Sequence, residues 1–254
     1  MCIVLIGWKA HQDYPLVVAA NRDEAHNRAS AYAHFWDELP QIYAGRDLEG
    51  GGTWLGVTRT GRFAAVTNYR DPSLYQENKH SRGQLVKEFL AGCESSMEYA
   101  LRIQKCANLY NPFNLLICDA ENLVWIGHVP NLPCQIMRLP PGIHGVSNHL
   151  INTPWPKIVS AKERFQASLS DLPDHAPLVK LLQVREYNEN KILVDCDLDS
   201  GINDLMSSTF IVSENYGTRS STILTASMNG QIYFEEVNYD PSGTEICRTE
   251  VKLC

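Results

Sequence analysis

The chain of 254 residues carries 22 Lys and Arg against 29 Asp and Glu, so its formal net charge at pH 7 is −7. Hydrophobic residues make up 44% and charged residues 20%, the proportions of a globular protein, which excludes wholesale disorder. Because there is no basic surplus to neutralise phosphates, the composition argues against a nucleic-acid-binding protein and against a binder of anionic membranes.

The sequence also argues against insertion into a membrane and against secretion. No uninterrupted apolar run approaches the ~20 residues that span a bilayer, and no Lys or Arg precedes the first apolar run as it would in a signal peptide. None of the eight cysteines forms a C-x-x-C pair, so we predict reduced thiols and no metal site. We therefore expect a cytoplasmic protein.

Strands are predicted in the first quarter of the chain. Residues 2–8 and 16–20 are rich in Val, Ile and Leu and predict a β-hairpin. Residues 21–52 are polar and predict an irregular segment. Residues 53–58 and 62–68 predict a second hairpin, with a glycine in its turn.

Helix pairs alternate with further strands in the rest of the chain. Two helices are predicted over residues 81–90 and 95–105, the second with a capping-box pattern at its start, and two more over 154–168 and 177–185. A polar, turn-rich surface loop near an opening is predicted over residues 195–206. The remaining predicted strands are residues 114–118, 123–127, 135–139, 144–147, 209–212, 222–226 and 232–237.

This order of elements predicts the fold class. Hairpins on either side of helix pairs suggest two antiparallel sheets flanked by helices, an α+β, four-layer αββα sandwich in which every apolar face is buried. No change of composition marks a boundary, so residues 1–254 are predicted to form a single domain.

Cys2 is the first candidate for chemistry. Removal of Met1 would place a thiol and a free α-amine on one residue, with reference pKa values of about 8.5 and 7.7–8.0. One residue would then supply both a nucleophile and a base near neutral pH. From its position alone, a cysteine of the core is the simpler interpretation. The residues around Cys2 therefore decide between a structural and a catalytic role.

The polar run Asn21-Arg22-Asp23-Glu24 follows the predicted partner of the first strand. The end of one hairpin strand returns beside the start of the other, which places this run close to Cys2. An arginine there would hold a thiolate and lower its pKa, and Asp23 would orient an amine. Three more candidates follow strands or turns: Asn68 and Asn148 as oxyanion donors and Arg219 as an anion-binding group.

These segments together resemble the NRDE family, also called the transport and Golgi organization protein 2 family. The resemblance is carried, in order, by Met-Cys at the start, Ala-Asn-Arg-Asp-Glu at 20–24, Gly-Gly-Thr-Trp-Leu-Gly at 51–56, Asn-Tyr-Arg at 68–70, Ser-Asn at 147–148, Thr-Pro-Trp-Pro-Lys at 153–157 and Tyr-Gly-Thr-Arg at 216–219. It implies the fold of the N-terminal-nucleophile hydrolases.

By similarity to the choloylglycine branch of these hydrolases, Cys2 would be the nucleophile. Arg22 and Asp23 would support it, Asn68 and Asn148 would line the oxyanion region, and Arg219 would complete the catalytic set. In that branch the supporting Arg and Asp stand three residues apart, whereas here they are adjacent. Asn21 with Glu24 is therefore the alternative supporting pair.

The resemblance also implies a second class of function, a haem-trafficking protein that binds haem as a ligand and passes it to haem-acceptor proteins. His26, His144, His149 and Cys2 are candidate axial ligands. Two hypotheses therefore remain: a haem chaperone built on a hydrolase-like fold, and a cysteine amidohydrolase that cleaves a small amide substrate through Cys2 without a cofactor.

Overall fold

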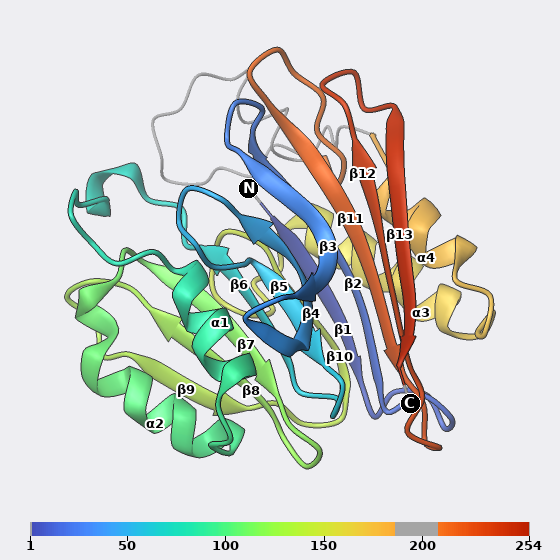
Figure 1. Cartoon of the computed structure of the whole chain (residues 1–254), viewed down its shortest axis with the longest axis horizontal. Helices are drawn as coiled ribbons and strands as arrows, with labels where there is room; N and C mark the ends of the chain where they lie inside the picture. The colour runs from blue at the N-terminus through green and yellow to red at the C-terminus, as the bar shows by residue number, and fades with distance from the viewer. Residues whose placement is uncertain (1, 186–207, 254) are drawn as a thin grey trace.

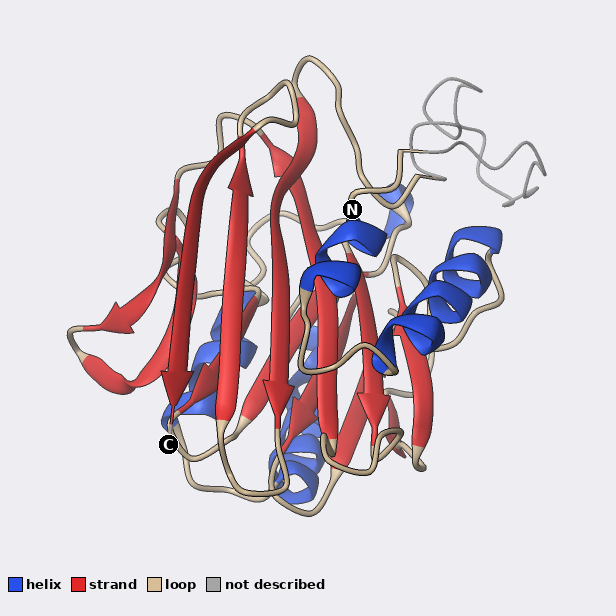
Figure 2. Ribbon diagram, turned by 90° about the vertical axis from the view of Figure 1, so that its right-hand side faces the viewer, coloured by secondary structure: helices blue, strands red, loops and turns tan. Residues whose placement is uncertain are grey.

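Two antiparallel β-sheets stack face to face, and a pair of helices covers the outer face of each (Figures 1 and 2). The computed structural model describes residues 2–185 and 208–253. Its layer order is helices, sheet, sheet, helices, which confirms the predicted α+β, αββα sandwich. No helix among the described residues is long and apolar enough to cross a membrane.

The first sheet has six strands in the order β10-β1-β2-β11-β12-β13. Its second and third strands form the predicted N-terminal hairpin, in which Trp8 pairs with Leu16. The strands are β1 (Ile3–Trp8), β2 (Leu16–Ala25), β10 (Gly142–Val146), β11 (Tyr216–Ala226), β12 (Ile232–Tyr239) and β13 (Glu245–Leu253).

The second sheet has seven strands, β3 to β9, which follow one another in sequence order. Each strand pairs antiparallel with the next, so short turns connect most of the sheet. The strands are β3 (Ser30–Trp36), β4 (Leu39–Asp47), β5 (Leu55–Thr58), β6 (Phe63–Asn68), β7 (Phe113–Cys118), β8 (Leu123–His128) and β9 (Gln135–Arg138).

The helices pack as the layer order requires. α1 (Gly83–Ala91) and α2 (Ser96–Cys106) contact the second sheet, whereas α3 (Pro156–Leu169) and α4 (Ala176–Leu182) contact the first. The predicted capping box is present: Ser95 accepts from the backbone N–H of Glu98, and the Glu98 carboxylate accepts from the backbone N–H of Ser95. Each helix pair covers the outer, apolar face of one sheet.

Three apolar cores separate the four layers. The core between the sheets includes Trp8, Phe63 and Phe234, and the core beneath α1 and α2 includes Phe89. The core beneath α3 and α4 includes Phe165. The strands of both sheets alternate between an inner and an outer core, which explains why the central strands are apolar on both faces.

The prediction of an irregular segment over residues 21–52 is wrong. β2 continues through the polar run to Ala25, and β3 and β4 follow it. Polar composition indicated a loop, but the side-chain amide of Asn21 is buried and hydrogen-bonded inside the fold. Buried polar groups with partners do not interrupt a strand.

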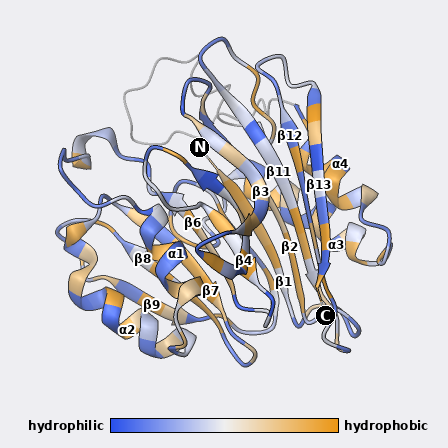
Figure 3. Ribbon diagram, viewed as in Figure 1, coloured by the Kyte–Doolittle hydropathy of each residue, from blue (hydrophilic) through white to orange (hydrophobic). Residues whose placement is uncertain are grey.

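Two other differences lie near the C-terminus. The predicted strand at 209–212 contains only an isolated bridge between Val212 and Gly217. β13 was missed because it is an edge strand whose hydrophilic and hydrophobic residues are mixed along its length (Figure 3). The surface loop predicted at 195–206 lies outside the described residues.

Gly52 allows the backbone of the 47–53 loop to contact the backbone at the start of α1. A Cβ atom on Gly52 would lie 2.4 Å from the carbonyl carbon of Gly83 and 2.5 Å from its oxygen. Because both obstacles are backbone atoms, Gly52→Ala is expected to lower the free energy of unfolding by about 1–3 kcal/mol. Denaturant unfolding measures this loss, and an unchanged midpoint would contradict the packing described.

Candidate active site

Cys2 lies immediately before β1, at the end of the first sheet where the polar part of β2 begins. Ile3 pairs with Asn21, and the same register continued by one residue sets Cys2 opposite Arg22. The Cys2 thiol donates to the backbone oxygen of Asp23, with Sγ 3.9 Å from that oxygen. The structure therefore brings Cys2 and the polar run together, as the hairpin geometry predicted.

The alternation of β2 separates the members of this run onto two faces. Ala20 belongs to the core between the sheets, and Ala19 belongs to the core beneath α3 and α4. Successive side chains of a strand point to opposite faces, so Arg22 faces the second sheet and Asp23 faces the helices. The two adjacent residues thus approach Cys2 from different sides of the sheet.

Asp23 is a buried carboxylate beside the nucleophile candidate. Its side chain is 5% exposed, and the hydroxyl of Thr218 donates to Oδ1 at 2.7 Å. Burial raises the pKa of Asp23, whereas the hydrogen bond from Thr218 and the positive charges of Lys157 and Arg22 act in the opposite direction. The carboxylate therefore accepts a hydrogen bond from a hydroxyl and is stabilised by the positive charges of two nearby cations.

Lys157 is the residue of this cluster that the sequence analysis did not select. It lies in the first turn of α3 and is 6% exposed, and burial lowers its pKa to about 8. The negative charge of Asp23 acts to raise that pKa. A cation at the N-terminus of a helix is unfavourable because the helix dipole is positive there. The only sequence signal was its place in the Thr-Pro-Trp-Pro-Lys segment at 153–157.

Burial raises the pKa of the Cys2 thiol, and the charge of Asp23 adds to this effect. The positive charge of Arg22 opposes it. The guanidinium of Arg22 stacks on Trp54, with its central carbon 4.5 Å from the ring centroid. Gly45 makes this possible, since a Cβ there would lie 2.2 Å from the indole.

Asn148 lies next to Cys2 on the other side, two residues after the end of β10. Val4 pairs with Val146, so the register continued by two residues sets Cys2 opposite Asn148. The hydroxyl of Ser147 donates to the Cys2 carbonyl oxygen at 3.0 Å, and Asn148 Nδ2 donates to the backbone oxygen of Asn68 at 3.0 Å. Asn148 is buried, whereas the Asn68 side chain is exposed.

The alternative supporting pair is not directed at Cys2. Asn21 faces the helix layer, where Nδ2 donates to the backbone oxygens of Leu182 and Thr209 at 2.8 Å each. The Glu24 carboxylate lies 3.9 Å from the guanidinium of Arg28. Of the two pairs, Arg22 and Asp23 are the ones whose charges act on the thiol.

Arg219 lies on the same side of the sheet as Arg22, at a bulge where β11 shifts its register against β2. Its Nη1 donates to the backbone oxygens of Ala25 and His26 at 3.0 Å each, which ties down the turn after β2. Arg22 and Arg219 line one cavity.

The three candidate haem-ligating histidines are engaged at separate places. His26 Nε2 lies 3.0 Å from the backbone oxygen of Ser213, and His149 Nδ1 lies 2.8 Å from the Thr153 hydroxyl. Both ring nitrogens of His144 are within hydrogen-bond distance of other groups. Haem binding through any of them stays a prediction, which a titration of the protein with haem, followed at the Soret band, tests.

Among residues 2–185 and 208–253, no group of three or more His, Cys, Asp or Glu is placed to hold a metal ion. The carboxylates near Cys2 are engaged by hydroxyl, amide or cationic partners.

Glu236 is a second titratable group that the sequence analysis missed. It is 1% exposed and accepts from the backbone N–H of Ala33 at 2.8 Å, and burial raises its pKa from 4.5 to about 7. Because the folded state then binds the proton more tightly than the unfolded chain, the free energy of unfolding should fall as pH rises from about 4.5 to 7, by up to about 3 kcal/mol.

Glu236→Gln is expected to remove this dependence. Denaturant unfolding of both proteins across this pH range measures it. The same slope in the variant and in the parent protein would assign the titration to another group.

Comparison with known proteins identifies the fold and the family of the chain. The fold matches that of a Caenorhabditis elegans N-acylethanolamine-hydrolyzing acid amidase ortholog with a TM-score of 0.50, at 11% identity, over 88% of this chain and 92% of that one. The chain thus has an N-terminal-nucleophile-hydrolase-like fold.

The chain belongs to the Transport and Golgi organisation 2 family, whose profile matches residues 1–241. The homolog from Bos taurus is 32% identical over 100% of this chain and 99% of its own length. The human homolog is 33% identical over 93% of this chain and 92% of its own, and the Drosophila melanogaster protein is 27% identical over 91% and 89%. The resemblance seen in the sequence is confirmed.

Proposed function

We propose that the protein is a cysteine amidohydrolase whose nucleophile is the Cys2 thiol, freed by removal of Met1. The observation that carries the proposal is the convergence of Asp23, Arg22 and Asn148 on Cys2, the residue just before the N-terminal hairpin. A buried cysteine of the core would not need a carboxylate, a guanidinium and an amide around it.

The first step uses the two groups of Cys2 together. The free α-amine takes the thiol proton, and the thiolate attacks the carbonyl carbon of an amide. Burial keeps the thiol protonated at rest, and the positive charge of Arg22 stabilises the thiolate that forms. Asp23, on the other face of the sheet, favours the protonated amine.

The second step breaks the C–N bond. Negative charge that develops on the substrate oxygen requires fixed N–H donors, and the Nδ2 group of Asn148 retains one hydrogen beyond the one it gives to Asn68. The protonated amine returns its proton to the leaving nitrogen, which departs as a free amine and leaves a thioester on Cys2. Water then hydrolyses the thioester to a carboxylic acid and regenerates the thiol.

Intact mass and activity measured on one preparation test the proposal. Protein that has lost Met1 should hydrolyse members of a panel of small N-acyl amides. A variant with one extra residue between Met1 and Cys2, in which the amine of Cys2 stays in a peptide bond, should not. Equal activity in the two forms would exclude the α-amine as the base. Absence of hydrolysis in protein shown to lack Met1 would count against the function itself.

A further inference from the structure

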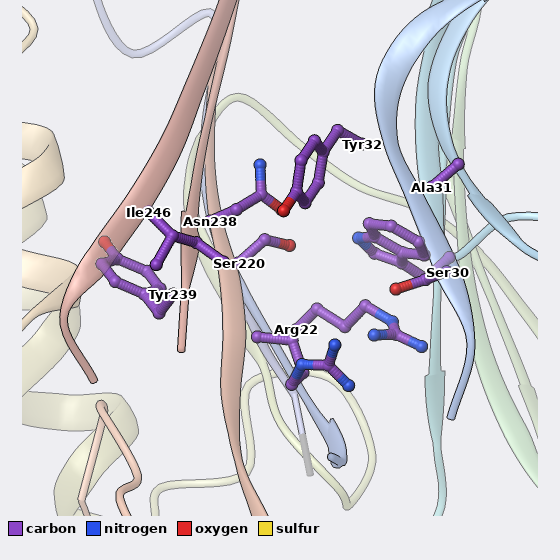
Figure 4. A pocket seen from close by; sticks show the side chains of 10 residues that line it. Arg22, Ser30, Ala31, Tyr32, Ser220, Asn238, Tyr239 and Ile246 are labelled. Atoms are coloured by element: carbon purple, nitrogen blue, oxygen red, sulfur yellow. The ribbon is translucent and has the colours of Figure 1, made fainter. Parts of the chain in front are cut away.

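A cavity of about 310 Å³ lies between the two sheets, beside the polar end of β2 (Figure 4). Side chains from β2, β3, β11 and β12 converge on it, and Cys2 is not among the residues that line it. The residues that matter for its chemistry are Arg22, Tyr32, Trp54, Arg219 and Asn238.

Arg22 is the unusual member of this lining. The residue is 5% exposed, yet among residues 2–185 and 208–253 its guanidinium makes no hydrogen bond within the fold and has no carboxylate within 4.0 Å. Its contact is the face of Trp54, and an aromatic face does not supply the oxygen acceptors that the guanidinium N–H donors prefer. A guanidinium that lines a cavity and makes no hydrogen bond to the protein can offer its N–H donors to a ligand in that cavity.

The neighbouring acids do not fill this role, because each has another partner. The Glu236 carboxylate accepts from the backbone of Ala33, and Glu24 and Asp47 both lie beside Arg28. Arg219 lines the cavity as a second guanidinium and acts to lower the pKa of Arg22. The cavity therefore holds two guanidinium groups and an open position for an anion.

A carboxylate matches this position better than a phosphate does. The guanidinium fork fits either anion, and the flat indole of Trp54 and the ring of Tyr32 favour a planar or apolar group next to it. The negative charges of Glu24 and Asp47 act on Arg22, so a dianion would meet more repulsion than a monoanion.

We propose that this cavity binds the free carboxylate of an amide substrate against Arg22 and Arg219. The inference rests on the proposed function, since Cys2 stands opposite Arg22 on β1 and β2 and would receive the amide of the same molecule. The substrate class is then small amides with a carboxylate close to the scissile bond, such as N-acyl amino acids.

Binding to Cys2→Ala protein tests the cavity apart from catalysis, because this variant cannot turn its ligand over. Calorimetric titration with N-benzoylglycine and with its neutral relative N-benzoylglycinamide should show at least about tenfold tighter binding of the acid. Inorganic phosphate serves as the comparator for other anions. No saturable binding of the acid, equal affinity for acid and amide, or tighter binding of phosphate would overturn the proposal.

Substitutions of Arg22 locate the binding. Arg22→Gln in the same background should remove the preference for the acid, and Arg22→Lys should keep part of it, because a point charge remains without the fork. Arg46→Gln is the matched control, since Arg46 also stacks on a tryptophan, Trp36, at 4.6 Å but has its own carboxylate partner, Glu38. An undiminished preference in Arg22→Gln protein that unfolds cooperatively would contradict the assignment.

The two proposals fail separately. If the Cys2→Ala protein prefers the acid but the parent protein hydrolyses no amide, the cavity stands and the amidohydrolase is wrong. If amides are hydrolysed but acid and amide probes bind alike, the amidohydrolase stands and the carboxylate subsite is wrong.

Discussion

Cys2→Ala protein is expected to lose at least about 10³-fold in amide turnover relative to the parent protein. The substitution removes the atom that attacks the carbonyl while it keeps a small side chain after Met1, so Met1 is still removed. Turnover of an N-acyl amide measures the loss, and intact mass verifies the N-terminus.

Cys93→Ala is the matched control for this experiment. Cys93 is exposed and takes no part in the cluster around Cys2, so its replacement should leave turnover unchanged. Full activity of Cys2→Ala protein would show that the thiol is not the nucleophile.

Asp23→Asn is expected to lower the free energy of unfolding at neutral pH by about 3–5 kcal/mol, because the buried Lys157 then loses the negative charge that balances it. Lys157→Met in the same chain should restore most of this loss, since no uncompensated cation remains. The double-mutant cycle, measured by denaturant unfolding, isolates the coupling between the two side chains.

The pH dependence of the Asp23→Asn protein supplies an independent reading of the same coupling. The pKa of Lys157 is about 8 in the folded parent protein, against an ordinary value of 10.5, so the unfolded chain binds more protons between these values. Loss of the Asp23 charge lowers the folded-state pKa further, so the free energy of unfolding of Asp23→Asn protein should begin to rise at a lower pH than that of the parent protein.

Asp37→Asn is the control for both measurements, because Asp37 is exposed and its charge is solvated. It should change the free energy of unfolding by no more than about 0.5 kcal/mol. A loss in Asp23→Asn protein that Lys157→Met does not relieve would show that the two charges are not coupled.

Local geometry accounts for the part of the site that was predictable from the residues. A hairpin returns its second strand beside the start of its first, so the proximity of Cys2 to the run that contains Arg22 and Asp23 followed from the chain order. The layer order of the fold followed in the same way from alternating hairpins and helix pairs.

Burial of polar groups accounts for the part that was not predictable. Asn21 looked like a loop residue, but its amide joins β2 to the segments at Leu182 and Thr209, which are far away in sequence. Lys157 and Glu236 gave no pattern of their own, because a single charged residue in a helix or strand normally faces solvent. Only tertiary packing decides that these two are enclosed.

The central claim is that the thiol of Cys2 attacks an amide carbonyl, and the most direct measurement is the identity of the residue that becomes acylated. Protein lacking Met1 is incubated with an N-acyl amide, quenched in acid and mapped by peptide mass spectrometry. We predict that one acyl group is found on the sulfur of Cys2 and that hydroxylamine releases it. Acylation at another cysteine, or turnover with Cys2 unmodified at every quench time, would contradict it.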